Sequence, residues 1–230
     1  MSNVVIAWTG GKDSSLASFE AERLGYKVEC LVTFAWNHEP FLAHPLDVIR
    51  LQANALQLPH YRLSVEEPFE RGYERALTML KRQHGVDCLI TGDIAEVGGH
   101  DPNWFEDRAI HSHIELIKPL WHRDRIELLK RLLELRFKVI FSCVKKPWFT
   151  DEWLGKEISA DTIQQLTVLS ARKGLDICGE QGEYHTLALD GPQFKKRIRV
   201  ESYSKREQES VAFIVISGMR LEESTKGELH

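Results

Sequence analysis

The segment Val4–Ser15 constrains the fold of this chain more than any other. An apolar run, Val4–Trp8, ends at Thr9-Gly10-Gly11, and Lys12-Asp13-Ser14-Ser15 follows at the start of an amphipathic stretch. This order predicts a buried strand that turns sharply into a helix. The two glycines allow backbone angles that other residues avoid, and they let an anion approach the main chain. The sequence therefore predicts a phosphate or pyrophosphate site at the N-terminus of a helix.

The residue types in this turn suit a phosphate. The helix dipole places partial positive charge at the first N–H groups, and Lys12 adds a full charge. Thr9, Ser14 and Ser15 carry hydroxyls that donate to phosphate oxygens. The segment matches neither G-x-x-x-x-G-K-[ST] nor G-x-G-x-x-G. An ordinary turn capped by Ser14 or Asp13 is the alternative, but the complete string favours phosphate binding.

Composition narrows the class of protein. A length of 230 residues with 43% hydrophobic residues predicts one large domain, or one domain with a smaller appendage. The net charge of -4 gives no general attraction to nucleic acid or to anionic membranes, so we expect neither as a partner. No apolar run is long enough to span a bilayer and no signal peptide is evident, which favours a cytoplasmic protein. Four scattered cysteines indicate neither a disulfide framework nor a zinc site.

Apolar runs alternate with helix-like segments over residues 1–144. This alternation predicts an α/β domain with a Rossmann-like, parallel, five-stranded sheet. Ligands gather at the carboxyl ends of parallel strands, where Thr33–Trp36 and Thr91–Asp93 join the glycine turn. We expect strands at Val4–Trp8, Val28–Phe34, Tyr61–Val65, Cys88–Thr91 and Lys138–Cys143, and helices at Asp13–Leu24, Pro45–Leu56, Phe69–Gln83 and from Asp124 onward.

The pattern changes near residue 145, which predicts a smaller α+β subdomain over residues 145–230. A helix capped by Asp161 and Gln164 and ended by Gly174 comes first. Strand-like runs follow, and the polar end Glu222–His230 is expected to fray. An exposed strand near Ser210–Ser217 is a candidate for pairing two chains into a homodimer, and the basic run from Lys195 to Arg199 indicates a solvated strand edge. The strand-like runs are Tyr184–Leu189, Ile198–Tyr203 and Val211–Ser217.

A second dense cluster of polar residues occupies Cys178–Thr186. Carboxylates there would orient an amine or hold a magnesium ion, and His185 would move a proton near neutral pH. A glycine-rich turn leading into a strand is the alternative, but the mixture of hydrogen-bonding groups favours a functional role. The pair His111 and His113 lacks a third ligand, so we do not expect zinc there. The side chains of the cluster that we expect to take part in function are Glu180, Glu183, Tyr184, His185 and Thr186.

Together the two clusters resemble the PP-loop family, the N-type ATP pyrophosphatases or adenine nucleotide alpha hydrolases. Thr9–Ser14 is similar to the family motif S-G-G-x-D-S, with threonine for the first serine. Gly179–Thr186 is similar to G-E-G-G-E-Y-x-T of the diphthine–ammonia ligase group, with Gln181 for a glycine. After the fourth strand, Gly92–His100 replaces the group's G-A-I-x-S-x-Y-Q-R-like stretch, a region expected to touch the acceptor. Further similarities are His44, Gln52-Ala53, Leu58-Pro59, Pro119-Leu120-Trp121, Trp153-Leu154-Gly155 and Asp190-Gly191-Pro192.

The resemblance implies an ATP-binding domain over residues 1–144, a substrate-binding subdomain over 145–230, and an ATP-dependent ligase that adenylates a carboxylate and then adds ammonia. It implies catalytic roles for Lys12, Asp13, Glu183 and His185, with Asp13 as a ligand of Mg²⁺. A nucleotide-binding sensor without ligase chemistry remains an alternative, as does an ATP pyrophosphatase that modifies tRNA. ATP would contact Thr9, Gly10, Gly11, Lys12, Asp13, Ser14, Ser15, Thr33, Phe34 and Gly92, and the acceptor would contact His44, Asp93, Glu180, Glu183, Tyr184, His185 and Thr186.

Overall fold

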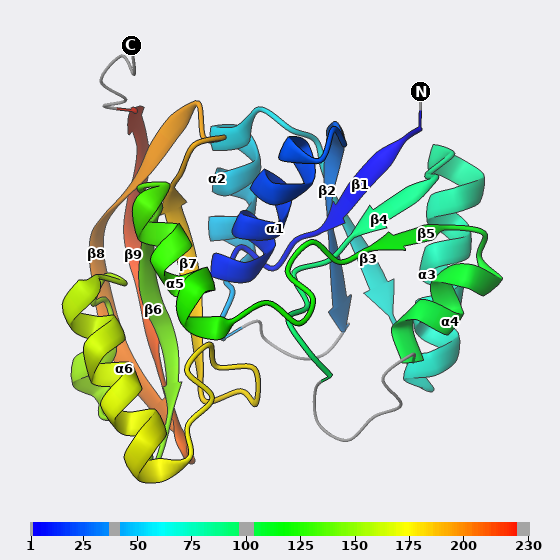
Figure 1. The fold of residues 1–230 in the computed structure, drawn as a ribbon. Coiled ribbons are helices and arrows are strands. Elements are labelled where there is room, and N and C mark those ends of the chain that lie inside the picture. The colour runs from blue at the N-terminus through cyan, green and yellow to red at the C-terminus, as the bar shows by residue number, and fades with distance from the viewer. Residues whose placement is uncertain (1, 37–41, 97–103, 225–230) are drawn as a thin grey trace. The chain divides into compact units, whose positions relative to one another are not determined.

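A computed structural model describes residues 2–36, 42–96 and 104–224 of the chain (Figure 1). The chain forms two compact units. Unit 1 comprises Met1–Thr9, Asp13–Pro40 and Leu58–Arg123, and unit 2 comprises Gly10–Lys12, Phe41–Gln57 and Asp124–His230. The backbone therefore passes from one unit to the other several times, and the glycine turn supplies residues to both.

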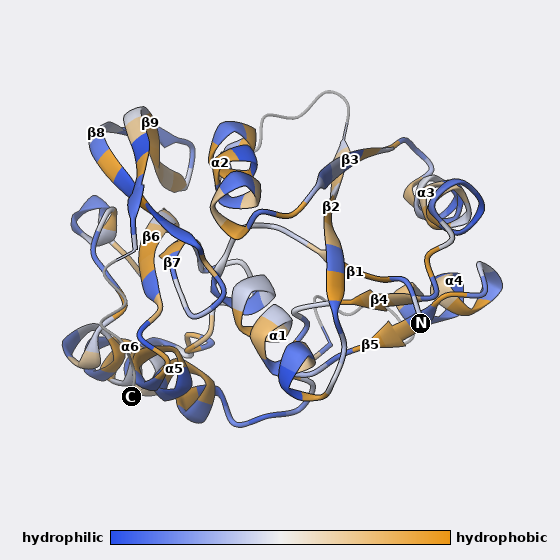
Figure 2. Ribbon diagram, turned by 90° about the horizontal axis from the view of Figure 1, so that it is seen from above, coloured by the Kyte–Doolittle hydropathy of each residue, from blue (hydrophilic) through white to orange (hydrophobic). Residues whose placement is uncertain are grey.

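Unit 1 contains a five-stranded sheet in the order β3-β2-β1-β4-β5. Every pairing is parallel, with β1 in the middle. Val5, Val32 and Leu89 pack with Leu77 and Leu80 of helix α3 in the core, and Figure 2 shows hydrophobic residues along β4 and β5. The strands are β1 Val4–Ala7, β2 Val28–Trp36, β3 His60–Val65, β4 Cys88–Ile90 and β5 Glu115–Ile117, and the helices are α1 Lys12–Arg23, α3 Phe69–His84 and α4 Trp104–His111.

Unit 2 contains a four-stranded antiparallel sheet in the order β7-β6-β9-β8. The fully buried ring of Phe141 on β6 lies 5.1 Å from the ring of Trp153 and 5.0 Å from that of Tyr184, measured between centroids. This aromatic cluster fixes the start of β7 against β6. The strands are β6 Lys138–Lys145, β7 Tyr184–Asp190, β8 Lys196–Gln208 and β9 Val211–Glu223, and the helices are α2 Leu46–Leu56, α5 Arg125–Glu134, α6 Ala160–Lys173 and the 3-10 helix η1 Asp151–Trp153.

The predicted α/β fold with a parallel five-stranded sheet is confirmed, but one strand was assigned to it wrongly. Lys138–Cys143 does form a strand, β6, yet it pairs antiparallel with β7 and β9 in the other sheet. The fifth parallel strand is β5, only three residues long and preceded by His113 with a φ of 55°. So short a strand carries no detectable alternation, which is why the sequence pattern missed it.

Two of the predicted helix ends in α5 and α6 are confirmed, and one is wrong. The carboxylate of Asp124 accepts the Glu127 N–H at 2.9 Å and caps α5, as predicted. Gly174 ends α6 with a φ of 67°, also as predicted. The predicted N-cap of α6 is wrong, because Ser159 occupies that position and exchanges hydrogen bonds with Thr162 in a capping box.

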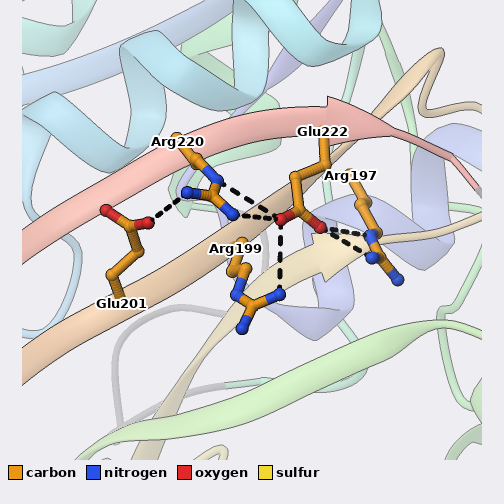
Figure 3. Close-up of polar contacts among 5 residues, drawn as sticks. All are labelled: Arg197, Arg199, Glu201, Arg220 and Glu222. Carbon is orange, nitrogen blue, oxygen red and sulfur yellow. Dashed lines mark hydrogen bonds and ion pairs between the residues drawn. The ribbon is translucent and has the colours of Figure 1, made fainter.

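The C-terminal residues form more regular structure than expected. Glu222 belongs to β9 and lies among three arginines (Figure 3), so the prediction that the chain frays from this residue is wrong. Arg197 donates to it at 2.9 Å, Arg220 at 2.9 Å, and Arg199 lies 3.4 Å away. The hydrogen bond from Arg220 lowers the pKa of Glu222 below its ordinary value. These contacts connect the start of β8 to the end of β9, at the end of the strand pair away from its turn.

The edges of the second sheet only partly match the sequence pattern. The basic run from Lys195 to Arg199 leads into β8, which is an edge strand, as predicted. The strand after Ser210 is β9, which pairs with β8 along its length and with β6 only through Val211–Phe213. The predicted strand is therefore not an exposed edge at Val211–Phe213, and its pairing of two chains stays a prediction. The domain boundary predicted between residues 144 and 145 stays a prediction, and the compact units divide elsewhere, since α5 and β6 belong to unit 2.

Candidate functional site

The predicted strand–turn–helix at the N-terminus is confirmed. β1 ends at Ala7 and α1 begins at Lys12, so Thr9–Gly11 form the turn. Gly10 has a φ of 80°, a left-handed conformation that favours glycine. The first N–H groups of α1 follow directly, which is the arrangement an anion requires.

Lys12 joins the turn to the second polar cluster. Its side chain is only 3% exposed, and its ammonium donates to the carbonyl of Cys178 at 2.5 Å. Its backbone N–H donates to the Thr186 hydroxyl at 3.0 Å, and its ammonium lies 5.3 Å from the centroid of the Tyr184 ring. The two segments that stood out in the sequence, 166 to 174 residues apart, thus meet at one lysine.

Two histidines predicted to contact the substrate lie beside this lysine. The rings of His44 and His185 meet edge to face, with centroids 5.3 Å apart. Burial lowers the pKa of His44 to about 3, with help from His185 and Lys12. Burial and then the charge of Lys12 lower the pKa of His185 to about 4. Both rings are therefore neutral at pH 7, and His185 does not titrate near neutrality as the sequence suggested.

One nitrogen of this pair is buried and has no hydrogen-bond partner within the described part of the chain. Among the described residues, none hydrogen-bonds to the buried Nδ1 of His44. The Cε1 of the same ring lies 3.3 Å from the position that a Cβ on Gly11 would occupy. Since buried polar atoms are nearly always paired, a polar group of a bound molecule is a fitting partner for this nitrogen.

The loop before β7 is held by its own side chains. The carboxylate of Glu183, 1% exposed, accepts the N–H of Asp176 at 2.8 Å and that of Gln181 at 2.9 Å. The Asp176 carboxylate accepts the Cys178 N–H at 2.8 Å and the Arg125 Nε–H at 2.7 Å. These bonds fix the backbone whose Cys178 carbonyl receives Lys12. Glu180 lies in the same loop and is half-buried.

Tyr184 and Thr186 also have partners in unit 2. The Tyr184 hydroxyl donates to the Ile177 carbonyl at 2.7 Å. Thr186 is buried at 2% exposed and accepts from Lys12. Their predicted contacts with the acceptor stay predictions.

In unit 1, the first turn of α1 carries the remaining loop residues. The hydroxyls of Thr9 and Ser14 lie 3.4 Å apart, and Ser14 and Ser15 are buried. A Cβ on Gly92 would lie 2.8 Å from the Asp13 carbonyl carbon and 2.8 Å from the Ser14 nitrogen. Only glycine lets the chain after β4 come so close to the helix N-terminus. The structure therefore confirms that Gly92 and this turn are neighbours.

Three other predicted residues of unit 1 are engaged in local contacts. Thr33 donates its hydroxyl to the Trp8 carbonyl at 2.7 Å and so ties β2 to the end of β1. Phe34 packs in an aromatic cluster, 5.3 Å from the Tyr73 ring centroid. Asp93 accepts the Thr91 hydroxyl at 2.7 Å. Their roles toward nucleotide or acceptor remain predictions.

The described residues fit a magnesium ion held mainly by phosphate. They contain no group of three or more His, Cys, Asp or Glu side chains placed to hold a metal. Mg²⁺ is commonly bound through one or two carboxylates together with substrate phosphates and water. Asp13, an acidic residue in the first turn of α1, stays the predicted protein ligand of such a set.

The sequence patterns gave no role to several residues that shape this region. Gln52 on α2 is fully buried and hydrogen-bonds to Gly10, and Asp176 and Arg125 brace the loop before β7. Gln52 is detectable in the sequence as a polar residue on the apolar face of a helix. Asp176 gave no comparable signal, because an acid before a glycine loop is common in turns.

These features define a class of nucleotide-phosphate-binding proteins, the PP-loop proteins: a parallel sheet whose middle strand leads through a glycine turn into a helix with a buried lysine. Matches to protein-family models identify the family within this class. The diphthamide synthase N-terminal domain matches residues 2–107, and the diphthamide synthase C-terminal domain matches residues 124–221. The chain belongs to the diphthamide synthase family.

Curated relatives extend over nearly the whole chain. A diphthine–ammonia ligase of Mus musculus is 26% identical over 239 residues, 93% of this chain and 88% of the relative. The Homo sapiens protein of the same name is 25% identical, covering 92% and 88%. A solved structure described as a predicted subunit of tRNA methyltransferase from Methanocaldococcus jannaschii aligns with a TM-score of 0.46 and 16% identity over 84% of this chain and 98% of that one. Within the described residues, no helix has the length and apolar character needed to cross a membrane.

Proposed function

We propose that this protein is an ATP-dependent, amide-forming ligase that adenylates a carboxylate, diphthine or a related acceptor, and transfers it to ammonia. The observation that carries the proposal is the convergence on Lys12 of the glycine turn and the loop before β7. A binding protein needs only the turn, whereas group transfer needs an acceptor surface beside it. The names of the relatives supply the acceptor class.

The chemistry needs activation because a carboxylate is a poor electrophile at neutral pH. A carboxylate oxygen attacks the α-phosphorus of ATP, the bond to the β-phosphate oxygen breaks, and pyrophosphate leaves. Ammonia then attacks the acyl carbon, the bond to AMP breaks, and the nitrogen loses a proton as the amide forms. Lys12 and the N-terminus of α1 offset the charge that develops on pyrophosphate. Mg²⁺, held by Asp13 and phosphate oxygens, would supply further charge neutralisation.

The remaining predicted residues take binding roles in this proposal. Thr9–Ser15 contact the phosphates, and Thr33, Phe34 and Gly92 contact the nucleoside. His44 and His185 act as neutral hydrogen-bonding groups, because an imidazole with a pKa of about 3 or 4 carries no charge at pH 7. Residues assigned to the acceptor are His44, Asp93, Glu180, Glu183, Tyr184, His185 and Thr186.

Two variants of the turn test the proposal. Lys12→Ala and Asp13→Ala are expected to abolish ATP-dependent release of pyrophosphate while the purified proteins remain folded. Lys130→Ala, which removes an exposed lysine of α5, is the matched control and should retain activity. Normal pyrophosphate release in both turn variants would contradict the assignment of the phosphate turn.

A separate experiment tests ammonia as the nitrogen donor. It compares the incorporation of label from ammonium with the incorporation of label from the glutamine amide.

A nucleotide-binding sensor is the second candidate, and one observation favours it. Both oxygens of Glu183 are used within their own loop, and His185 is neutral, which leaves fewer groups for acid–base chemistry. A sensor binds ATP tightly without forming AMP or pyrophosphate across a panel of carboxylates with ammonium. Turnover with any member of that panel excludes it.

We also propose a homodimer that pairs the β8 edges of two copies. In antiparallel pairing about Tyr203, Arg199 lies opposite Glu207, and Glu201 lies opposite Lys205. These four side chains are each more than a third exposed, and their present ion pairs are weak enough to exchange. Arg199→Glu and Glu207→Arg should each give a monomer by light scattering, and the double variant should restore the dimer. A monomeric wild type contradicts the proposal.

We also propose a cytoplasmic location for the protein, and cell fractionation tests it.

A further inference from the structure

Gln52 has a geometry that ties it to the phosphate turn. Its side chain is fully buried, and its amide nitrogen donates to the Gly10 carbonyl at 2.8 Å and to the Ala188 carbonyl at 2.8 Å. The Ala188 N–H also donates to the Gly10 carbonyl, at 2.9 Å. One side chain of α2 thus joins the turn to strand β7.

We infer that Gln52 is a positioning residue that holds the Gly10–Gly11 peptide in the orientation the phosphate turn requires, an inference that rests on the proposed function of that turn. A trans peptide is planar, with its C=O and N–H pointing in opposite directions. Two hydrogen bonds on the Gly10 carbonyl therefore also fix the direction of the Gly11 N–H. The peptide orientation is set before any nucleotide arrives, which reduces the ordering that binding requires.

The chemistry of the amide explains why glutamine fits this place. An NH₂ group has two donor hydrogens and reaches two carbonyls at once. A glutamate would bring oxygen against oxygen, and a leucine of similar shape would offer no donor. The fit is also steric, because a Cβ on Gly10 would lie 2.3 Å from the Gln52 Oε1. Gly10 and Gln52 therefore depend on one another.

The first test measures nucleotide affinity in Gln52→Leu and Gln52→Glu. We expect the Kd for ATP to rise roughly 10- to 100-fold in folded protein, the loss expected from one or two net hydrogen bonds. Asn54→Leu, an exposed change on the same helix, is the matched control and should bind ATP like the wild type. A residue with only a structural role would lower the Tm and leave the affinity of the folded protein unchanged, and that result overturns the inference.

The second test does not depend on ATP. In protein labelled with ¹⁵N-glycine, the amide resonances of Gly10 and Gly11 should shift in Gln52→Leu and stay in place in Asn54→Leu. If Gln52→Leu fails to fold, Gln52→Met, which keeps the length of the side chain without its donors, takes its place. Unchanged resonances in a folded variant overturn the inference. A wild type that binds no ATP refutes the proposed function instead, and the inference is then decided by the glycine resonances alone.

Discussion

The loop before β7 offers a sharp test, because one buried carboxylate holds it. In Glu183→Gln, one carboxylate oxygen becomes an NH₂ group that faces a backbone N–H, either that of Asp176 or that of Gln181. Donor then meets donor, and one buried N–H loses its acceptor. The shape of the side chain hardly changes, so the effect isolates the hydrogen bonds.

The magnitude follows from those two bonds. A hydrogen bond to a charged group contributes roughly 1.5–3 kcal/mol, and a buried donor left unpaired costs roughly 1–3 kcal/mol. These two terms overlap, so we expect the loop to lose about 2–4 kcal/mol of local stability. Each 1.4 kcal/mol is about a factor of ten, so the amides of Asp176 and Gln181 should exchange hydrogen roughly 30- to 700-fold faster.

The assay is amide hydrogen exchange combined with pyrophosphate release. Glu152→Gln makes the same chemical change at an exposed position and should alter neither reading. Unchanged exchange at both amides would refute the reasoning about the loop. Lost activity with unchanged exchange would instead favour the direct catalytic role that the sequence predicts for Glu183.

Two further predictions follow from the same region. Gly92→Ala should destabilise the protein by about 1–3 kcal/mol in urea unfolding, because its Cβ would meet the backbone of Asp13 and Ser14 at 2.8 Å; a urea midpoint equal to that of the wild type would contradict the close approach. Acid should destabilise the protein through His44 and His185, whose pKa values lie near 3 and 4 in the folded state and at the ordinary 6.5 when unfolded. Below pH 6.5 the unfolded chain binds more protons, so stability falls toward about pH 4 by up to about 1.4 kcal/mol per pH unit for each histidine. The urea midpoint of His44→Asn should depend less steeply on pH, and an unchanged slope would argue against a buried neutral ring.

Sequence alone predicted the parallel sheet because its signals are local. The run Val4–Trp8, the glycine turn and the helix predicted over Asp13–Leu24 are contiguous in the sequence, and the cap at Asp124 lies within a four-residue motif. β5 and the sheet membership of β6 depend instead on pairing with distant strands. The residues of Lys138–Cys143 form a buried apolar run and carry no signal that identifies β7 and β9 as their partners. The sequence pattern therefore places this strand in the parallel sheet, which is the wrong sheet.

The same contrast between local signals and distant partners applies to the residues of the candidate site. The residues predicted to supply chemistry, such as Lys12, lie in dense polar strings, and both clusters are visible in the sequence. Residues that hold those strings in place are single side chains far away, as with Gln52, 42 residues from Gly10.

Glu183 shows why a polar cluster alone does not assign roles to its members. Its place in a polar cluster indicates catalysis, but its carboxylate is used to shape the backbone that receives Lys12. A polar cluster in a sequence therefore marks where a site lies without dividing its members into those that react and those that position, since both kinds need the same atoms. That division requires hydrogen-bond partners, and here the partners show that Gln52 holds the Gly10 carbonyl and that Glu183 holds two backbone N–H groups of its own loop. The roles toward substrate predicted for Lys12, Asp13, Glu183 and the two histidines stay predictions.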